Sequence, residues 1–212
     1  MKDNLNNNIV NLVGEIASEF TYNHEVFGEG FYVADLKVRR ISENSDLIPI
    51  MVSERMVDVN KLPVGTRVEI SGQFRSYNRH DGLKKQLMLS VFVREIEFSN
   101  DITDSSEIKL DGYICKKPTY RKTPLGREIT DILLAVNRPY GKSDYIPCIC
   151  WGRNARYASK FEIGSHIQIV GRIQSREYAK HISETEAETR TAYEVSVSKI
   201  ELIKEDIGCR LS

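Results

Sequence analysis

The chain repeats itself once, and this repeat limits the possible folds more than any other feature. Residues 11–16 (NLVGEI) align with residues 109–114 (KLDGYI) at an offset of 98 positions. At the same offset, residues 45–49 (SDLIP) align with residues 143–147 (SDYIP). Stacked solenoids need at least three copies of a shorter unit. Two long copies therefore indicate one small fold that has been duplicated.

The segment between the two copies has the composition of a linker. Residues 99–107 (SNDITDSSE) are polar, acidic and rich in serine, which favours an exposed connection. Each copy is long enough to form a small core of its own. We therefore expect an N-terminal tail at 1–10, a first domain at 11–98, the linker at 99–107, a second domain at 108–203 and a short C-terminal tail at 204–212.

The second copy predicts five strands and one short helix, and the first copy is expected to follow the same plan. The polar segments 116–126 and 176–189 are expected to be loops. Residues 153–161 carry apolar side chains at helical spacing. Short apolar or alternating runs predict strands at 108–115, 128–137, 144–151, 166–175 and 191–203. Five strands with a helix between the third and fourth form the OB-fold, so we expect an all-β chain of two tandem five-stranded Greek-key barrels.

Composition and charge narrow the functional classes. Lys plus Arg and Asp plus Glu are both 30, and 41% of residues are hydrophobic, as in ordinary globular proteins. No apolar run approaches the roughly 18 residues of a membrane span, and the polar start predicts no export and a cytoplasmic protein. The balance is uneven, however, because residues 11–98 hold 11 basic and 13 acidic residues whereas residues 108–202 hold 16 and 11. The second copy is therefore basic, as a nucleic-acid binder requires.

The cysteines and histidines do not predict a metal or catalytic site. Cys148 and Cys150 are two positions apart, which is closer than the spacing of structural zinc ligands, and no second pair follows them. We interpret them, with Cys115 and Cys209, as reduced structural thiols. No carboxylates or other ligands cluster at productive spacing, so we expect no enzyme activity, no metal and no cofactor.

Several stretches of the second copy resemble the bacterial single-stranded DNA-binding proteins. These stretches are LLAVNR at 133–138, SDYIPC at 143–148, CWGRNA at 150–155 and IGSHIQIVGRIQSR at 163–176. The resemblance covers residues 108–202 well and residues 11–98 more weakly. It implies a nucleoid-associated protein without catalytic activity that coats single-stranded DNA during replication, repair or recombination. Because four OB-folds act together in this family, it also implies a homodimer.

Sequence-tolerant binding of single strands needs a basic groove and aromatic side chains that stack on bases. By motif position, the resemblance assigns stacking to Tyr140, Tyr145, Trp151 and Tyr178. Phosphate contacts are expected from Arg138, Arg172 and Arg176. The segment between the first two predicted strands borders the usual oligonucleotide groove of the fold, and it contributes Lys116, Lys117, Tyr120, Arg121, Lys122 and Arg127.

The first copy departs from this pattern. Leu47 aligns with Tyr145, and Ser53 aligns with Trp151, so the matching stacking positions are empty of aromatics. We expect this half to bind DNA more weakly or to serve assembly. Its candidate contacts are Tyr22, Tyr77, Arg75 and Arg79.

Three alternatives stay open from the residues alone. The basic segment at 116–127 could be an ordinary solvated loop, and Trp151 could be a core residue, since tryptophan is usually well buried. The whole chain could be an OB-fold adaptor of the primosome type that binds proteins first and nucleic acid weakly. The family usually ends in an acidic tail that recruits replication and repair proteins, whereas this sequence ends EDIGCRLS without an acidic run, so we expect no recruitment by that route.

Overall fold

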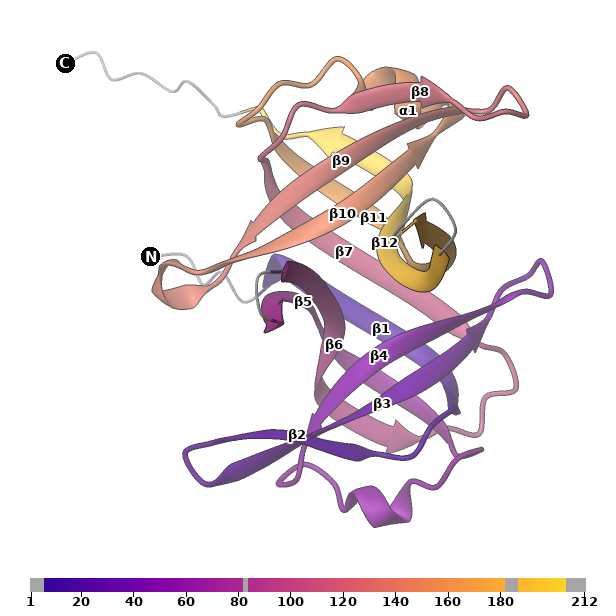
Figure 1. The fold of residues 1–212 in the computed structure, drawn as a ribbon, viewed down its shortest axis with the longest axis vertical. Helices are drawn as coiled ribbons and strands as arrows, with labels where there is room; N and C mark the ends of the chain where they lie inside the picture. Colours follow the sequence, from indigo (N-terminus) through magenta and orange to yellow (C-terminus); the bar gives the residue numbers. More distant parts are fainter. Residues whose placement is uncertain (1–5, 82–83, 182–186, 205–212) are drawn as a thin grey trace.

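The computed structural model describes residues 6–81, 84–181 and 187–204, and nearly all of its regular structure is strand (Figure 1). The first half contains β1 (Asn8–Ile16), β2 (Thr21–Val26), β3 (Glu29–Arg39), β4 (Ser45–Ser53), β5 (Arg67–Asp81) and β6 (Lys84–Phe98). The second half contains β7 (Ser105–Ile114), β8 (Thr119–Lys122), β9 (Glu128–Asn137), β10 (Ser143–Trp151), β11 (His166–His181) and β12 (Ala187–Leu202). The prediction of an all-β chain is confirmed.

The strands pair into one hydrogen-bonded sheet whose order is β2-β3-β4-β6-β5-β1-β7-β11-β12-β10-β9-β8. Two additional pairings, β1 with β3 and β7 with β9, bring distant parts of this order together. Each half therefore contains a closed circuit of five paired strands, β1-β3-β4-β6-β5 and β7-β9-β10-β12-β11. β2 and β8 extend the circuits as hairpin partners of β3 and β9. The repeat in the sequence is thus a repeat of strand pairing.

Glycines make the closing pairings possible. A Cβ atom on Gly112 would lie 2.5 Å from the carbonyl oxygen of Ala135, on the strand that closes the second circuit. Its repeat partner Gly14 has the same relation to the carbonyl of Lys37, also at 2.5 Å. Because a side chain at either position would collide with backbone, only glycine allows the strands to approach this closely.

The expected helix is present in one half only. α1 spans Gly152–Ala158, where Ala155 and Ala158 are buried. At the matching place the first half has a three-residue 3-10 helix, Val59–Lys61, so the prediction of a short helix in both halves is wrong there. Valine at the first position lowers helix propensity, and the segment ends just before Pro63, which disfavours helical backbone at the preceding residue.

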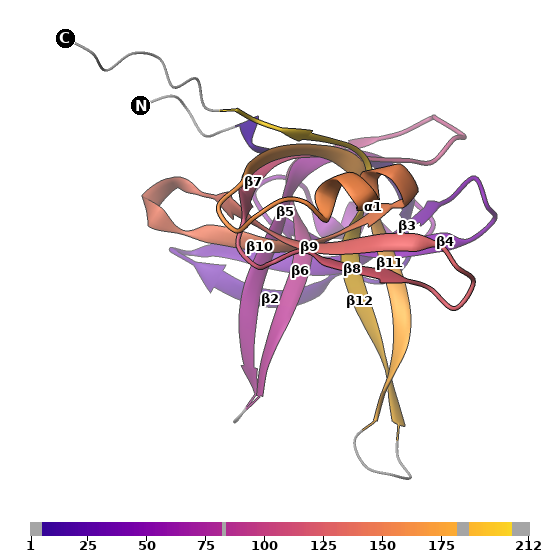
Figure 2. The ribbon, with the colours of Figure 1, turned by 90° about the horizontal axis from the view of Figure 1, so that it is seen from above.

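Two segments expected to be loops form strands instead. Residues 119–122 form β8, which pairs with β9, and β11 and β12 extend to His181 and Ala187 as one long hairpin. The hairpin leaves the body of the molecule alongside the matching β5–β6 hairpin, on the same side (Figure 2). Both faces of a projecting hairpin contact water, so its sequence loses the apolar alternation on which strand prediction depends.

The two halves join through their first strands. β1 and β7 are antiparallel partners, with Val10 opposite Ile108, and the buried apolar residues of both halves belong to one cluster. Within the described residues, no helix is long and apolar enough to cross a membrane.

Two reciprocal contacts, which we call the latches, also tie the halves together. In one latch the guanidinium of Arg138 donates to Asp144 at 2.7 Å and to the carbonyl of Ser76, in the other half, at 3.0 Å. The backbone N–H of Ser76 donates to the same carboxylate of Asp144 at 2.6 Å. In the matching latch Arg40 pairs with Asp46, and the N–H of Ser175 donates to that carboxylate at 2.7 Å. Each half thus supplies one Arg–Asp pair that holds a backbone segment of the other.

Candidate nucleic-acid interface

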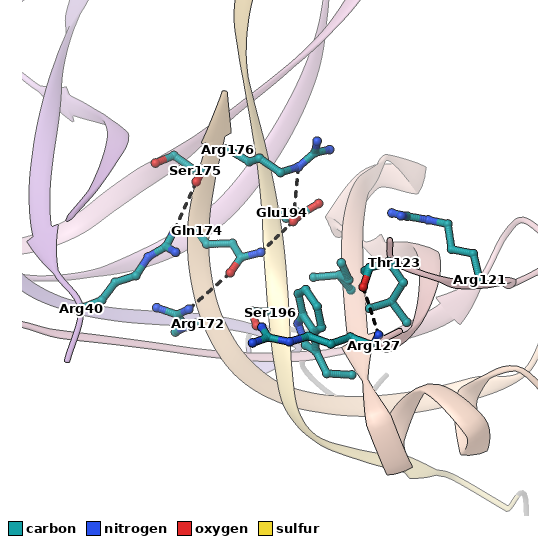
Figure 3. Close-up of a pocket in the computed structure, with 13 residues that line it drawn as sticks. Arg40, Arg121, Thr123, Arg127, Arg172, Gln174, Ser175, Arg176, Glu194 and Ser196 are labelled. Atoms are coloured by element: carbon teal, nitrogen blue, oxygen red, sulfur yellow. Dashed lines mark hydrogen bonds and ion pairs between the residues drawn. The ribbon is translucent and has the colours of Figure 1, made fainter. Parts of the chain in front are cut away.

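A groove of about 520 Å³ runs across the second half and is called here the second-half groove (Figure 3). Its walls come from the β8–β9 hairpin, the end of β10 and the curved β11–β12 hairpin. Trp151 and five arginines contribute to its lining. The arginines are Arg40, Arg121, Arg127, Arg172 and Arg176.

Trp151 reaches the groove because it is the last residue of β10. Alternation along this strand places Ile146, Cys148 and Cys150 in the core, where all three are buried. Trp151 points to the opposite side and keeps 37% of its surface exposed. This exposure excludes the alternative that Trp151 is an ordinary core residue, and it leaves an aromatic surface available in a basic groove.

The arginines of the groove outnumber the carboxylates that pair with them. The Arg121 Nε lies 2.7 Å from an Asp131 oxygen, and the Arg176 Nε lies 4.0 Å from a Glu194 oxygen. Within the described residues, Arg127 makes no ion pair. Hydrogen bonding to Asp131 raises the pKa of Arg121, so this guanidinium stays charged. The groove therefore keeps an excess of positive charge.

Arg40 was not among the predicted site residues. It belongs to the first half of the chain, yet it lines the second-half groove. It follows β3 and lies beside the second-half groove, where its Nη2 donates to the carbonyl of Ser175 at 3.2 Å. The sequence did hold a signal, because Arg40 is the repeat partner of Arg138, which was predicted. The second-half groove is thus built from both copies.

A second groove, of about 380 Å³, occupies the matching place in the first half and is called here the first-half groove. The predicted residues Arg75, Tyr77 and Arg138 line it. His24 and Phe92 also line it and were missed. The Arg75 Cζ lies 3.9 Å from the centre of the Phe92 ring. The aromatic side chains of this groove therefore come from β2, β5 and β6, not from the β4 positions that match Tyr145 and Trp151.

The other predicted residues lie outside the lining of both grooves. Tyr140 is fully exposed in the turn between β9 and β10, and the Arg176 Cζ lies 5.9 Å from the centre of the Tyr178 ring. The hydroxyl of Tyr120 donates to Glu128 at 2.6 Å. The side chain of Arg79, another predicted contact, is not among those that the structure describes. The remaining members are exposed, and for all of them a DNA contact stays a prediction: Lys116, Lys117, Lys122 and Tyr145.

The two thiols of β10 form no disulfide, and burial keeps them protonated. Cys148 and Cys150 are buried and free. Burial raises the pKa of Cys150 to about 12 and raises that of Cys148 as well. Among the described residues, no group of three or more His, Cys, Asp or Glu side chains could hold a metal ion.

Comparison with known families assigns the half that carries the second-half groove. Residues 106–203 match the model of the "Single-strand binding protein family". We call residues 106–203 the single-strand binding half, after the family whose model they match. The match begins two residues before the expected domain boundary and ends at the expected residue, so the single-strand binding half contains β7 to β12 almost entirely.

Relatives of the single-strand binding half come from several bacteria. The chain is 35% identical over 80 residues to single-stranded DNA-binding protein 2 of Listeria innocua, covering 34% of this chain and 50% of the relative. It is 34% identical over 80 residues to single-stranded DNA-binding protein A of Bacillus subtilis, covering 34% and 46%. The chain thus spans about half the length of the curated relatives it matches.

Similarity to solved structures extends over both halves. The wild-type single-stranded DNA binding protein from Thermus aquaticus superposes with a TM-score of 0.75, covering 95% of each chain at 16% identity. A deletion variant of the same protein gives a TM-score of 0.74 at 18% identity, covering 96% of this chain and 98% of that one. At such low identity the likeness concerns the fold alone. It therefore shows that the first half, which lies outside the family match, has strands arranged as in the Thermus aquaticus protein.

Proposed function

We propose that the chain binds single-stranded DNA with little sequence preference and protects it during replication, repair or recombination, without catalysing a reaction. The observation that carries the proposal is the second-half groove, in which one half-exposed tryptophan lies among five arginines, four of them from the single-strand binding half. Stacking on an aromatic ring accepts any base, and arginines bind phosphates that every nucleotide carries. A groove with these two components therefore selects single strands rather than a sequence.

The arrangement of the groove supports a path for the strand. Bases of a single strand are exposed, so one of them can stack on Trp151 at the end of β10. The phosphates then follow the arginines of β11, Arg172 and Arg176, and those of the β8–β9 hairpin, Arg121 and Arg127. Arg121 must exchange its contact with Asp131 for a phosphate oxygen, and this costs little because both side chains of the pair are exposed.

We also propose that each five-strand circuit is an OB-fold. The first circuit begins with β1 at Asn8 and the second with β7 at Ser105, so the expected domains at 11–98 and 108–203 each begin three residues earlier, and the expected linker at 99–107 shortens to residues 99–104. The closed pairing of strands in each half and the likeness to the two Thermus aquaticus structures support this division. Two copies of the chain would bring four such folds together, so we propose a homodimer. The expected tails include residues 1–5 and 205–212, which lie outside the described part.

The experiment that tests this function uses the single tryptophan of the chain as its own reporter. Oligo-dT of several lengths is titrated into the full chain at two salt concentrations while tryptophan fluorescence is recorded. We expect quenching, because Trp151 stacks on a base, and a log–log salt dependence with a slope of about −0.7 for each neutralised phosphate. Light scattering should give a mass of about 49 kDa, twice the chain mass of 24.3 kDa.

A matched pair of variants separates groove contacts from general charge. Arg172→Gln removes a groove arginine, whereas Arg153→Gln removes an exposed arginine of α1. We expect the first to lower the magnitude of the salt slope by about 0.7 and the second to leave it unchanged. Absence of binding at low salt, or binding without quenching and without salt dependence, would contradict the proposal and favour a protein-binding adaptor.

A further inference from the structure

A small cavity at the junction of the two halves is separate from the region where Trp151 lies. Its volume is about 70 Å³, far below the roughly 300–1,000 Å³ of pockets that hold whole small-molecule ligands. Three arginines line it, together with Asp144 and neutral amide side chains. We call it the junction cavity, and its arginines are Arg75, Arg94 and Arg138.

Arg94 reaches the junction cavity through an irregularity in strand pairing. On β6, Val93 pairs with Gly72 and Glu95 pairs with Ser71, so Arg94 is the extra residue of a β-bulge. A bulge turns its extra side chain away from the regular alternation. Here the side chain at the bulge is a long cation that lines the cavity.

The other half has the same bulge with different chemistry. On β12 the extra residue is Ser198, between Val197 and Lys199. Its hydroxyl donates to the carbonyl of Val170 at 2.9 Å, so this bulge satisfies its own side chain locally. Arginine at the first-half bulge is therefore not required by the geometry of the fold, and it adds a charge that the matching place in the second half lacks.

The positive charge around the junction cavity is only partly compensated. Asp144 is paired with Arg138. The Nη2 of Arg75 donates to the neutral Gln73 Oε1 at 2.9 Å, and within the described residues Arg94 makes no ion pair. Burial lowers the pKa of Arg75, and the charges of Arg138 and Arg94 lower it further. Three guanidinium groups thus line a cavity whose described lining includes one carboxylate, Asp144.

Two donors in this cluster lack an acceptor. The Nε atoms of Arg75 and Arg138 are buried, and neither has a hydrogen-bond partner. A buried donor without a partner is unfavourable, and the penalty is larger for a charged group. Both side chains line the junction cavity and also the first-half groove. Their Nε atoms are covered in the empty cavity, so a bound anion would accept from them only after the guanidinium groups reorient, while the strands stay in place.

We propose that the junction cavity is a binding site for one phosphate-type oxyanion, held by Arg75, Arg94 and Arg138. Guanidinium groups match the oxygens of phosphate in geometry and charge. The small volume admits one such group and excludes a whole nucleotide. The anion is either free phosphate or a phosphate of a bound strand, and only the second source rests on the proposed function.

The test follows the two unpartnered donors directly. Arginine Nε–H signals of the full chain are recorded by nuclear magnetic resonance during titration with inorganic phosphate at constant ionic strength. We expect saturable shifts of the Arg75 and Arg138 signals, and a thermal unfolding midpoint that rises with phosphate. Arg94→Ser, which introduces the residue found at the second-half bulge, should weaken phosphate binding about tenfold.

A matched variant controls for the loss of one charge. Arg55→Ser removes a first-half arginine whose side chain is 64% exposed and which does not line the cavity. It should bind phosphate as the unmodified chain does. Shifts that grow without saturation, or equal binding by the Arg94→Ser and Arg55→Ser variants, would overturn the proposal.

A second arm identifies the source of the phosphate. The titration is repeated with saturating oligo-dT, whose binding is followed separately by tryptophan fluorescence. Loss of free phosphate binding assigns the cavity to a strand phosphate, and retained binding assigns it to free phosphate. Because the first arm contains no DNA, failure of the oxyanion site is distinguishable from failure of single-strand binding.

Discussion

Trp151 owes its exposure to its place at the end of a strand. The residues before it alternate between the core and the outer face, and the chain turns into α1 directly after it. The ring therefore stands at the rim of the core with one side open to the groove. A single aromatic in this position is expected to contribute a large part of the stacking free energy.

The first prediction concerns this ring. Trp151→Ala should weaken binding of labelled oligo-dT, measured by fluorescence polarisation, by about 1–3 kcal/mol, while Trp151→Phe should lose much less. Tyr157→Ala serves as the control, because this exposed tyrosine of α1 packs against Phe161 outside the groove. Equal weakening by the Trp151→Ala and Tyr157→Ala variants would refute a stacking role.

The buried thiols of β10 give a pH dependence with a defined sign. The pKa of Cys150 is raised from 9.0 to about 12, and that of Cys148 is also raised. As pH rises above 9, the unfolded chain loses thiol protons that the folded chain keeps, so the free energy of unfolding falls. At pH 9.5 we expect a loss of about 0.8 kcal/mol for each thiol relative to pH 7.5, measured by urea denaturation.

The control for this pH dependence is a chain with Cys148→Ala and Cys150→Ala. Its absolute stability changes because core atoms are removed, but its dependence on pH between 7.5 and 9.5 should become flatter. The readout is therefore the slope and not the midpoint. An unchanged slope would show that the two thiols are not responsible.

At the scale of elements, strand alternation predicted well where one face of a strand is buried. β9 spans the predicted residues 128–137, and β10 and β7 differ from their predictions by one and three residues at their starts. Alternation gave no signal for β8 or for the outer part of the β11–β12 hairpin, since these strands contact water on both faces. In the candidate site, the predicted residues Trp151, Arg121, Arg127, Arg172 and Arg176 line the second-half groove. Their contact with DNA stays a prediction, and Arg40 and Arg94 were not predicted.

Arg40 and Arg94 were missed for different physical reasons. Arg40 reaches the second-half groove only because the two halves pack together, and neither half alone reveals this relation. Arg94 depends on a bulge, which appears when two particular strands pair with a one-residue shift. Contacts between copies and irregularities of pairing are properties of the assembled sheet. The repeat therefore marks Arg40 only as the partner of Arg138, and no pattern along the chain marks Arg94.

The latches between elements lead to a prediction about stability. Asp144 is almost fully buried, and it binds both Arg138 and the N–H of Ser76 from the other half. Asp144→Asn keeps the shape but removes the charge, so it leaves the Arg138 guanidinium without its counterion. Because that guanidinium is partly exposed, we expect a loss of about 2 kcal/mol in the free energy of unfolding.

Asp131→Asn is the matched control for the Asp144 variant. Asp131 also pairs with an arginine, Arg121, but both side chains are more than 40% exposed, and exposed pairs contribute about 0–1 kcal/mol. Chemical denaturation of the two variants at the same pH makes the comparison. If Asp131→Asn were as destabilising as Asp144→Asn, burial at the junction would not explain the effect.

At the scale of the whole molecule, the two halves are related by repeat but not by chemistry. Each half has a groove at the matching place, and each groove includes an arginine of the other half, Arg40 in one and Arg138 in the other. The second-half groove carries Trp151 where the first half has Ser53. Charge follows the same division, since the second copy is basic and the first is slightly acidic.

This asymmetry predicts a division of labour that can be measured in one set of variants. Tyr145→Ala combined with Trp151→Ala should weaken oligo-dT binding at least tenfold more than Tyr22→Ala combined with Tyr77→Ala, because stacking on each base is worth about 1–3 kcal/mol and the second half holds the tryptophan. All four aromatic side chains are exposed, so both double variants should fold. Polarisation titrations at fixed salt give the comparison. If the two double variants lost affinity equally, the first half would stack on DNA as strongly as the second, and His24 and Phe92 of the first-half groove would be the next side chains to substitute.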